Sequence, residues 1–157
     1  MTQPAKSPRP HDNRRATVRI MSYEILEGLA SLARLRGGDM IRLLVFTGIW
    51  SANTQHLIPS GRYSTLQDIP PDSQRLPIPQ HVLAEQICMP GDIVARYVDQ
   101  LVEDGIVERL AGGLVVPSAV FRRPDMMDGS NEFYARVVQM VVALRGAGFQ
   151  FGEASEI

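Results

Sequence analysis

The sequence is poor in cysteine and in long apolar runs. Its single cysteine, Cys88, excludes an internal disulfide framework. No apolar run reaches the roughly 18 residues that are needed to cross a bilayer. No apolar stretch follows the basic residues near the start of the chain, as a secretory signal would require. We therefore expect a cytoplasmic protein that does not enter a membrane.

Motifs of catalysis and of metal binding are also missing. The sequence has no phosphate loop, no nucleophile elbow and no paired catalytic carboxylates. Its three histidines, His11, His56 and His81, are scattered and have no metal-ligand spacing with Cys88. Because Cys88 has no basic neighbour beside it, a buried structural cysteine is favoured, with a redox sensor as the alternative. We expect no enzyme, no cofactor and no bound metal.

What the chain does have is apolar material for one ordinary core, with 157 residues of which 45% are hydrophobic. The net charge of −1 is uneven, because residues 1–19 hold five basic residues and one acidic residue. This segment is rich in proline and is predicted to be a disordered basic arm. Arg14 and Arg15 are its candidate phosphate contacts, and the alternative is a solubilising tail. A single domain over 20–147 and a flexible tail over 148–157 complete the expected organisation.

Two helices are expected in the first third of the chain. Apolar residues at helical spacing predict a helix over 22–36, with Ser22 as its N-cap. A second helix is expected over 39–53, capped by Asp39 and apolar on several sides, which is typical of a buried helix. Prolines and glycine then predict an irregular connection over 57–75, either mobile or with a short strand near 62–66.

The middle of the chain predicts a helix-turn-helix over 79–105. Pro79 suits the first turn of a short helix ending near Ile87, and a tight turn follows. Asp92 is expected to cap a second helix over 92–104, and Gly105 suits its left-handed C-cap.

A β-hairpin is expected directly after these helices. Two short apolar strands, 106–110 and 114–116, flank an Ala-Gly-Gly turn, and Pro117 ends the second strand. Together with the two helices, this wing over 106–117 predicts a winged helix-turn-helix. The expected fold class is therefore mainly α with a small β-hairpin wing (α+β), with flanking N- and C-terminal helices.

The same segment resembles the helix-turn-helix of the cyclic-AMP receptor/Fnr class of bacterial regulators. The matching residues are Leu83-Ala84 in the first helix, Val94 and Arg96 in the recognition helix, and Leu101, Glu103 and Gly105-Ile106-Val107 up to the first wing strand. The resemblance implies a DNA-binding transcriptional regulator with 92–104 as its recognition helix. The class usually has glycine where this chain has Cys88, and glutamate where it has Asp92. The overall layout is similar to that of small dimeric MarR-like regulators.

The expected partner is double-stranded DNA, and the resemblance indicates which residues are candidates to contact it. Arg96 can contact guanine in the major groove, and its alternative is an ion pair with Asp92 or a hydrogen bond with Gln100. Gln100 can reach a base or a phosphate, and Tyr97 can reach a phosphate or simply pack its ring. Arg109 in the wing can contact a phosphate or remain a solvated charge.

The recognition helix is acidic, which favours an alternative function. Residues 91–104 contain four acidic residues and one arginine. Because DNA repels carboxylates, the alternative is a winged-helix module for protein–protein interaction with little or no DNA binding.

A last helix is expected over 131–145. Its apolar stripe is broader than packing against one core requires. We therefore expect a homodimer through 22–36 and 131–145, with a monomer as the alternative.

Overall fold

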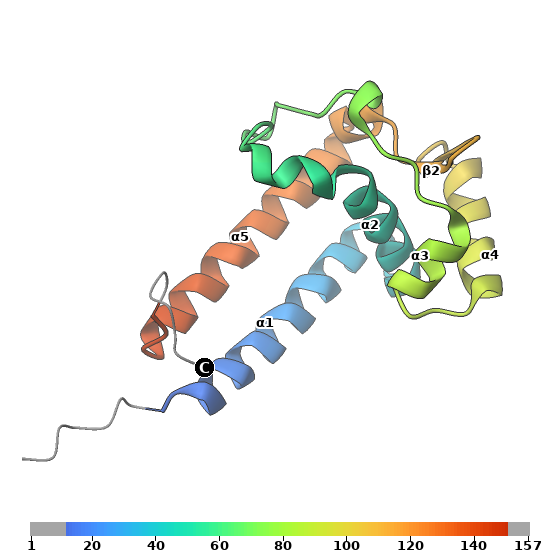
Figure 1. Cartoon of the computed structure of the whole chain (residues 1–157). Helices are drawn as coiled ribbons and strands as arrows, with labels where there is room; N and C mark the ends of the chain where they lie inside the picture. The colour runs from blue at the N-terminus through green and yellow to red at the C-terminus, as the bar shows by residue number, and fades with distance from the viewer. Residues whose placement is uncertain (1–11, 151–157) are drawn as a thin grey trace, which may run out of the picture.

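A computed structural model describes residues 12–150, which are mainly helical with one small antiparallel sheet. Two long helices, α1 (Arg14–Leu35) and α5 (Pro124–Gly146), run antiparallel and form an arm that projects from a head made by the other elements (Figure 1). The head contains α2 (Met40–Thr54), α3 (Gln80–Gln86), α4 (Gly91–Glu103), β1 (Glu108–Leu110), β2 (Gly113–Val115) and the 3₁₀ turns η1 (Gln55–Ser60), η2 (Asp72–Gln74) and η3 (Ser118–Arg122).

Both helices of the arm begin earlier than the sequence patterns predict. The expected disordered arm over 1–19 is wrong for residues 14–19, which form the first turns of α1, while residues 1–11 lie outside the described part. The amide of Asn13 donates a hydrogen bond to the carbonyl of Ala147, 3.3 Å away, so the start of α1 is tied to the end of α5. Helix α5 begins at Pro124, where the missing N–H of proline leaves no bond unmade.

The core of the head is built around α2. Asp39 caps this helix as expected, because its carboxylate accepts a hydrogen bond from the backbone N–H of Arg42 at 3.0 Å. Val45 and Ile49 of α2 are fully buried. They belong to one cluster with apolar side chains from α3, α4, the hairpin and η3, namely Leu83, Val94, Val98, Leu101, Leu114, Val116 and Val120.

The strands of the hairpin are shorter than expected, and a residue from outside the hairpin pairs with the second strand. Leu110 pairs with Gly113, so two residues form the turn between β1 and β2. Ile78, directly before α3, pairs with Leu114 of β2 through reciprocal backbone hydrogen bonds of 3.1 and 2.8 Å. This isolated bridge fixes the start of α3 against the sheet, and therefore positions α3 and α4 relative to the hairpin.

The connection after α2 contains 3₁₀ turns, and no strand forms over 62–66. Arg75, near its end, is one of two buried polar residues of the described chain, together with Asn53 of α2. The segment lies against the α2 and α5 ends on the side of the head away from α4 (Figure 1).

Candidate nucleic-acid interface

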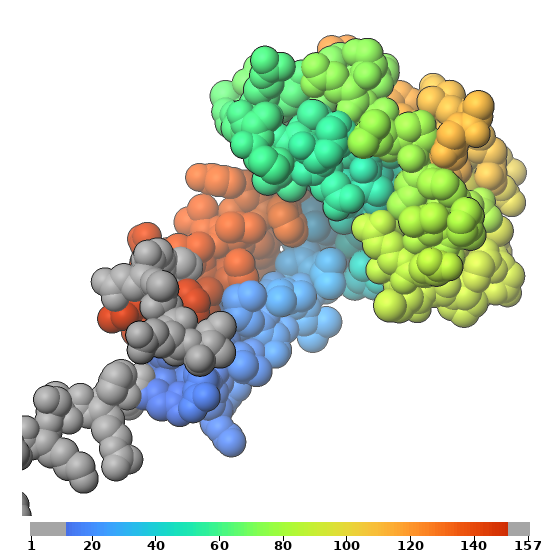
Figure 2. Space-filling model, viewed as in Figure 1, coloured from blue at the N-terminus to red at the C-terminus, as the bar shows by residue number. Residues whose placement is uncertain are grey.

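Helices α3 and α4 are joined by a short turn and pack closely together. The backbone N–H of Met89 bonds to the carbonyl of Ala84 at 3.0 Å, which closes the turn. Helix α3 also approaches α2 at Gly48, where an added Cβ would lie 2.8 Å from Leu83 Cδ1. A side chain at this position would require Leu83 and Ile87 to shift. Helix α4 lies at the edge of the head (Figure 2).

Helix α4 has one buried side and one exposed side. Val94, Val98 and Leu101 are buried in the core at 1% exposure or less. The opposite side carries exposed residues at helical spacing, which we call the α4 face: Asp92, Arg96, Asp99, Gln100 and Glu103. The α4 face is therefore free of contacts with the core and available to a partner.

Arg96 lies near the middle of the α4 face. Its guanidinium carbon lies 5.4 Å from the ring centroid of Tyr97. Within residues 12–150 it makes no ion pair with Asp92 and no hydrogen bond with Gln100. The Arg96 guanidinium is exposed to solvent.

Arg109 on β1 is engaged with two other elements. Its Nη2 bonds to the carboxylate of Asp99 on α4 at 2.5 Å, and its Nη1 bonds to Oε1 of Gln80 on α3 at 3.2 Å. The side chain is 47% exposed. Arg109 thus neutralises Asp99 and ties the hairpin to both helices.

A second arginine pairs with the last acid of this region. Nη2 of Arg42 on α2 lies 2.5 Å from Oδ2 of Asp104, at the C-cap of α4. Two of the four acids in 91–104 are therefore balanced by arginines from other elements, Asp99 by Arg109 and Asp104 by Arg42. Asp92 and Glu103, one at each end of the α4 face, make no ion pair with any residue that the structure describes.

Asp92 does not have the capping role that was expected, and Tyr97 has the packing role that was its alternative. Pro90 is the N-cap of α4, and no side chain caps it, so Asp92 lies in the first turn without the expected capping bond. Its negative charge still suits the positive end of the helix dipole. Tyr97 is half-buried and packs against the core, as its alternative interpretation states. Gln100 is exposed on the α4 face as expected.

Arg14 and Arg15 are not part of this surface. They lie in the first turn of α1, at the end of the arm that is farthest from α4 (Figure 1). Arg14 bonds to both oxygens of Asp12, at 3.0 and 2.9 Å, and this exposed pair raises the pKa of the Arg14 guanidinium. Within one chain, these two arginines therefore belong to a different surface from that of Arg96.

Cys88 corrects a further expectation. It is exposed in the turn between α3 and α4, not buried. Its φ of 53° is left-handed, a conformation that favours glycine. No group of three potential metal ligands occurs among residues 12–150.

Sequence reasoning missed the partners that organise the surface. Gln80 lies 29 positions before Arg109, and Arg42 lies 62 positions before Asp104. No local spacing rule brings such residues together, because only the packing of α2 and α3 against α4 does so. An excess of acids on one exposed helix was the available signal that some of them could pair with cations from elsewhere in the chain.

The comparisons with known proteins add no relative. No helix of the described residues combines the length and the apolar character that a membrane span needs. No family model matches the chain, and neither the curated proteins nor the solved structures contain a significant match to it.

Proposed function

We propose that this chain is a winged-helix transcriptional regulator that presents α4 to the major groove of double-stranded DNA. The observation that carries the proposal is the α4 face, which is exposed beside a β-hairpin while its opposite side is built into the core. A helix of this kind fits the width of the major groove, and Arg96 can donate to guanine O6 and N7 there. Gln100, one turn further along, is the second candidate for a base or phosphate contact.

The order of elements supports the winged-helix assignment. Helix α2 is followed by the strand-like residue Ile78, then by α3 and α4, and then by the hairpin β1–β2. The pairing of Ile78 with Leu114 adds an isolated bridge to the two-stranded sheet at this point. In DNA-binding motifs of this kind, the second helix of the pair enters the groove while the first crosses the backbone.

The ion pairs within the head weaken the electrostatic objection to this proposal. Asp99 would repel DNA from the middle of the α4 face if it were alone. Its carboxylate is instead bonded to Arg109, and Asp104 is bonded to Arg42. The repulsion that remains comes from Asp92 and Glu103 at the two ends of the face.

The apolar outer surface of the arm supports a homodimer. Helices α1 and α5 contact each other along their length, and Ser31 Oγ donates a 2.6 Å bond to Glu132. Large apolar side chains nevertheless remain exposed along both helices: Val18, Tyr23, Ile25, Leu26, Phe133, Tyr134, Val138 and Val142. Two helices cannot cover their own outer sides, whereas two copies of the arm can form a four-helix bundle. A dimer also carries two α4 faces, as readers of paired half-sites do.

A second candidate function uses the same fold to bind a protein. The unpaired carboxylates of Asp92 and Glu103 favour it, because they flank Arg96 with negative charge. A basic peptide or protein surface would complement them.

A titration of the full chain against a labelled random-sequence duplex at low salt distinguishes these functions. Fluorescence anisotropy should rise with protein concentration, and the binding should weaken steeply as salt is added. Absence of binding even at low salt would contradict DNA recognition and favour the protein partner. Light scattering should show a dimer at high micromolar concentration, and a monomer there would exclude dimerisation through the arm.

A further inference from the structure

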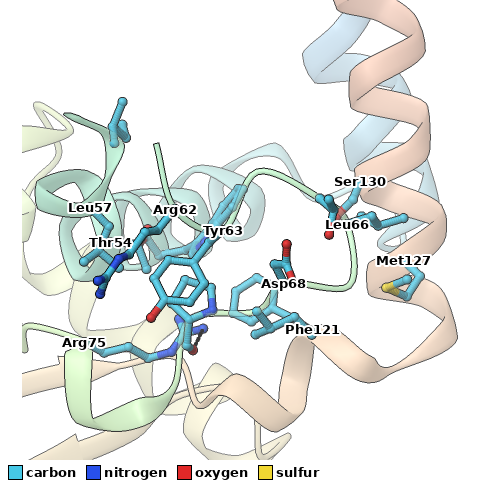
Figure 3. Close-up of a pocket in the computed structure, with 15 residues that line it drawn as sticks. Thr54, Leu57, Arg62, Tyr63, Leu66, Asp68, Arg75, Phe121, Met127 and Ser130 are labelled. Carbon is cyan, nitrogen blue, oxygen red and sulfur yellow. Dashed lines mark hydrogen bonds between the residues drawn. The ribbon is translucent and has the colours of Figure 1, made fainter. Parts of the chain in front are cut away.

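A cavity of about 320 Å³ lies on the far side of the head from the α4 face. It is enclosed by the end of α2, the segment 57–75, η3 and α5 (Figure 3). Three aromatic rings contribute to its wall: Trp50, Tyr63 and Phe121. Aliphatic side chains and Met127 complete a lining that is mostly apolar. Its size is within the range of small-molecule sites, which runs from about 300 to 1,000 Å³.

One buried cation lies in this apolar lining. The side chain of Arg75 is 1% exposed, and its guanidinium carbon lies 5.0 Å from the ring centroid of Phe121. Its Nη2 donates a 3.0 Å hydrogen bond to the carbonyl of Pro70. Neither Nε nor Nη1 has a hydrogen-bond acceptor among residues 12–150. Burying a charged group with unused donors is costly, so an acceptor that reaches Arg75 from the cavity would stabilise it.

The nearest carboxylate does not satisfy the unused donors of Arg75. Oδ1 of Asp72 lies 3.5 Å from Nε of Arg75, without the geometry of a hydrogen bond. That carboxylate is bonded to Ser118, with Oδ1 accepting from the backbone N–H at 2.6 Å and Oδ2 accepting from Oγ at 3.2 Å. Burial lowers the pKa of the Arg75 guanidinium, and Asp72 opposes that shift only in part. The Asp72 carboxylate therefore leaves donors of Arg75 unused, and a second anion could accept hydrogen bonds from them.

Three of the four hydroxyl groups of the lining are bonded within the chain, and the fourth belongs to the exposed Thr65. The Tyr63 hydroxyl donates to Gln74 at 2.6 Å, and the Thr54 hydroxyl donates to the carbonyl of Trp50 at 3.0 Å. The Ser130 hydroxyl bonds to the backbone of its own helix. Two further charges, Arg62 and Asp68, are exposed at the rim and have opposite signs (Figure 3). Arg75 is therefore the buried cation of the lining with donors to spare, whereas the Arg62 guanidinium is open to solvent.

We propose that this cavity binds a small carboxylic acid with an apolar ring, whose carboxylate accepts hydrogen bonds from Arg75 and whose ring packs against Trp50, Tyr63 and Phe121. One cation with spare donors matches one carboxylate, and the aromatic wall matches a flat apolar body. The bound carboxylate completes the hydrogen bonding of Arg75, so the free energy of binding includes the removal of an unsatisfied buried donor. This site is separate from the α4 face, and binding to it is measured without DNA.

The intrinsic fluorescence of the protein reports on this site directly, because the single tryptophan, Trp50, lines the cavity. The probes are benzoate and cyclohexanecarboxylate, each paired with its neutral amide as a control of nearly the same shape. We expect saturable fluorescence changes with both acids, and binding of the amides that is weaker by roughly tenfold or more. Equal affinity for acid and amide, or no saturable binding of either acid, would overturn the proposal.

Variants of the protein test whether Arg75 causes the preference for the acid over its amide. Arg75→Met should remove the preference for the acid over the amide, whereas the matched change Arg122→Met at an exposed arginine should leave it intact. Ser130→Phe fills part of the cavity without altering Arg75 and should abolish binding of both probes, which keeps the test decisive if Arg75→Met does not fold. A preference for the acid that persists in Arg75→Met, or unchanged binding in Ser130→Phe, would contradict the assignment.

Discussion

The side-chain amide of Asn53, near the end of α2, donates a 3.0 Å hydrogen bond to the backbone carbonyl of Leu114 in β2. Asn53 is fully buried, and all of its polar atoms are used. Its Nδ2 also donates to the carbonyl of Leu76 at 2.8 Å, and its Oδ1 accepts from the N–H of Val116 at 2.9 Å. One side chain therefore joins α2, the segment before α3 and the second strand of the hairpin.

Replacing Asn53 with alanine should destabilise the whole head. The change leaves the buried N–H of Val116 and the carbonyl of Leu76 without their partners, whereas the carbonyl of Leu114 keeps its bond from the N–H of Ile78. We expect the free energy of unfolding to fall by about 3 kcal/mol. Urea denaturation measures this directly. The same substitution at the exposed Asn131 on α5 is the control and should have little effect. Equal stability of the two variants would show that the Asn53 hydrogen bonds do not hold the hairpin in place.

The two glycines of the hairpin should respond very differently to alanine. Gly113 has a φ of +131°, and an added Cβ would lie 2.3 Å from the carbonyl oxygen of Ile78. At Gly112, a Cβ would meet the Pro77 ring at 3.4 Å, an ordinary contact. We expect Gly113→Ala to cost more than about 3 kcal/mol, because it adds strain and breaks the bridge to Ile78. Gly112→Ala should change the unfolding free energy by well under half of that, and similar losses for both would contradict the bridge.

The sequence patterns predicted the elements of the head well because their signals are local. The Asp39 cap, the paired helices near 80–104 and the hairpin around 111–113 depend on residues that are close in the chain. The Ile78 bridge could not be predicted in this way. Prolines on both sides of Ile78 suggest a loop, and the pairing with Leu114 depends on tertiary contacts alone.

In the arm, the local sequence pattern gave a wrong prediction. Charge and proline content suggested that residues 14–19 belong to an unfolded segment, but the prolines end at Pro10 and the helix begins at Arg14. Contact with α5, through Asn13 and Ala147, stabilises these first turns. The exposure of Cys88 also differs from the prediction, because the residue lies in the turn between α3 and α4 and not on the buried side of either helix.

Acid should loosen the contact between α1 and α5. The Glu132 carboxylate accepts hydrogen bonds from Ser31 Oγ at 2.6 Å and from Arg136 Nε at 3.0 Å, and these bonds lower its pKa below the ordinary value of 4.5. A lowered pKa in the folded state means that the stabilisation is complete above the ordinary value and is lost as the pH falls through the lowered one.

The difference in melting temperature between wild type and Glu132→Gln measures this effect. We expect the variant to be the less stable protein at neutral pH and the gap to close as the pH falls below 4.5. Glu103→Gln, at an exposed glutamate of α4, serves as the control and should show no such pattern. If the difference in melting temperature grew as the pH fell, the pKa of Glu132 would not be lowered in the folded protein.

Removing the charge of Asp99 should strengthen DNA binding. Asp99→Asn deletes a negative charge from the α4 face and releases Arg109 from its ion pair, so both effects favour contact with phosphates. We expect affinity for duplex DNA at low salt to rise by roughly threefold to tenfold, with a smaller gain at higher salt. Asp104→Asn, whose partner Arg42 comes from α2, is the matched control with little expected change. Weaker binding of Asp99→Asn would place DNA elsewhere on the molecule.

The most direct test of the account is the effect of Arg96→Ala on binding to a duplex selected from a random pool by the full chain. Fluorescence anisotropy should show a loss of affinity of about tenfold or more, since one guanidinium contact to guanine contributes roughly 1–3 kcal/mol. Arg34→Ala, the same change at an exposed arginine of α1, should bind like the wild type. Unchanged affinity of Arg96→Ala for that duplex would show that α4 is not the helix that meets DNA.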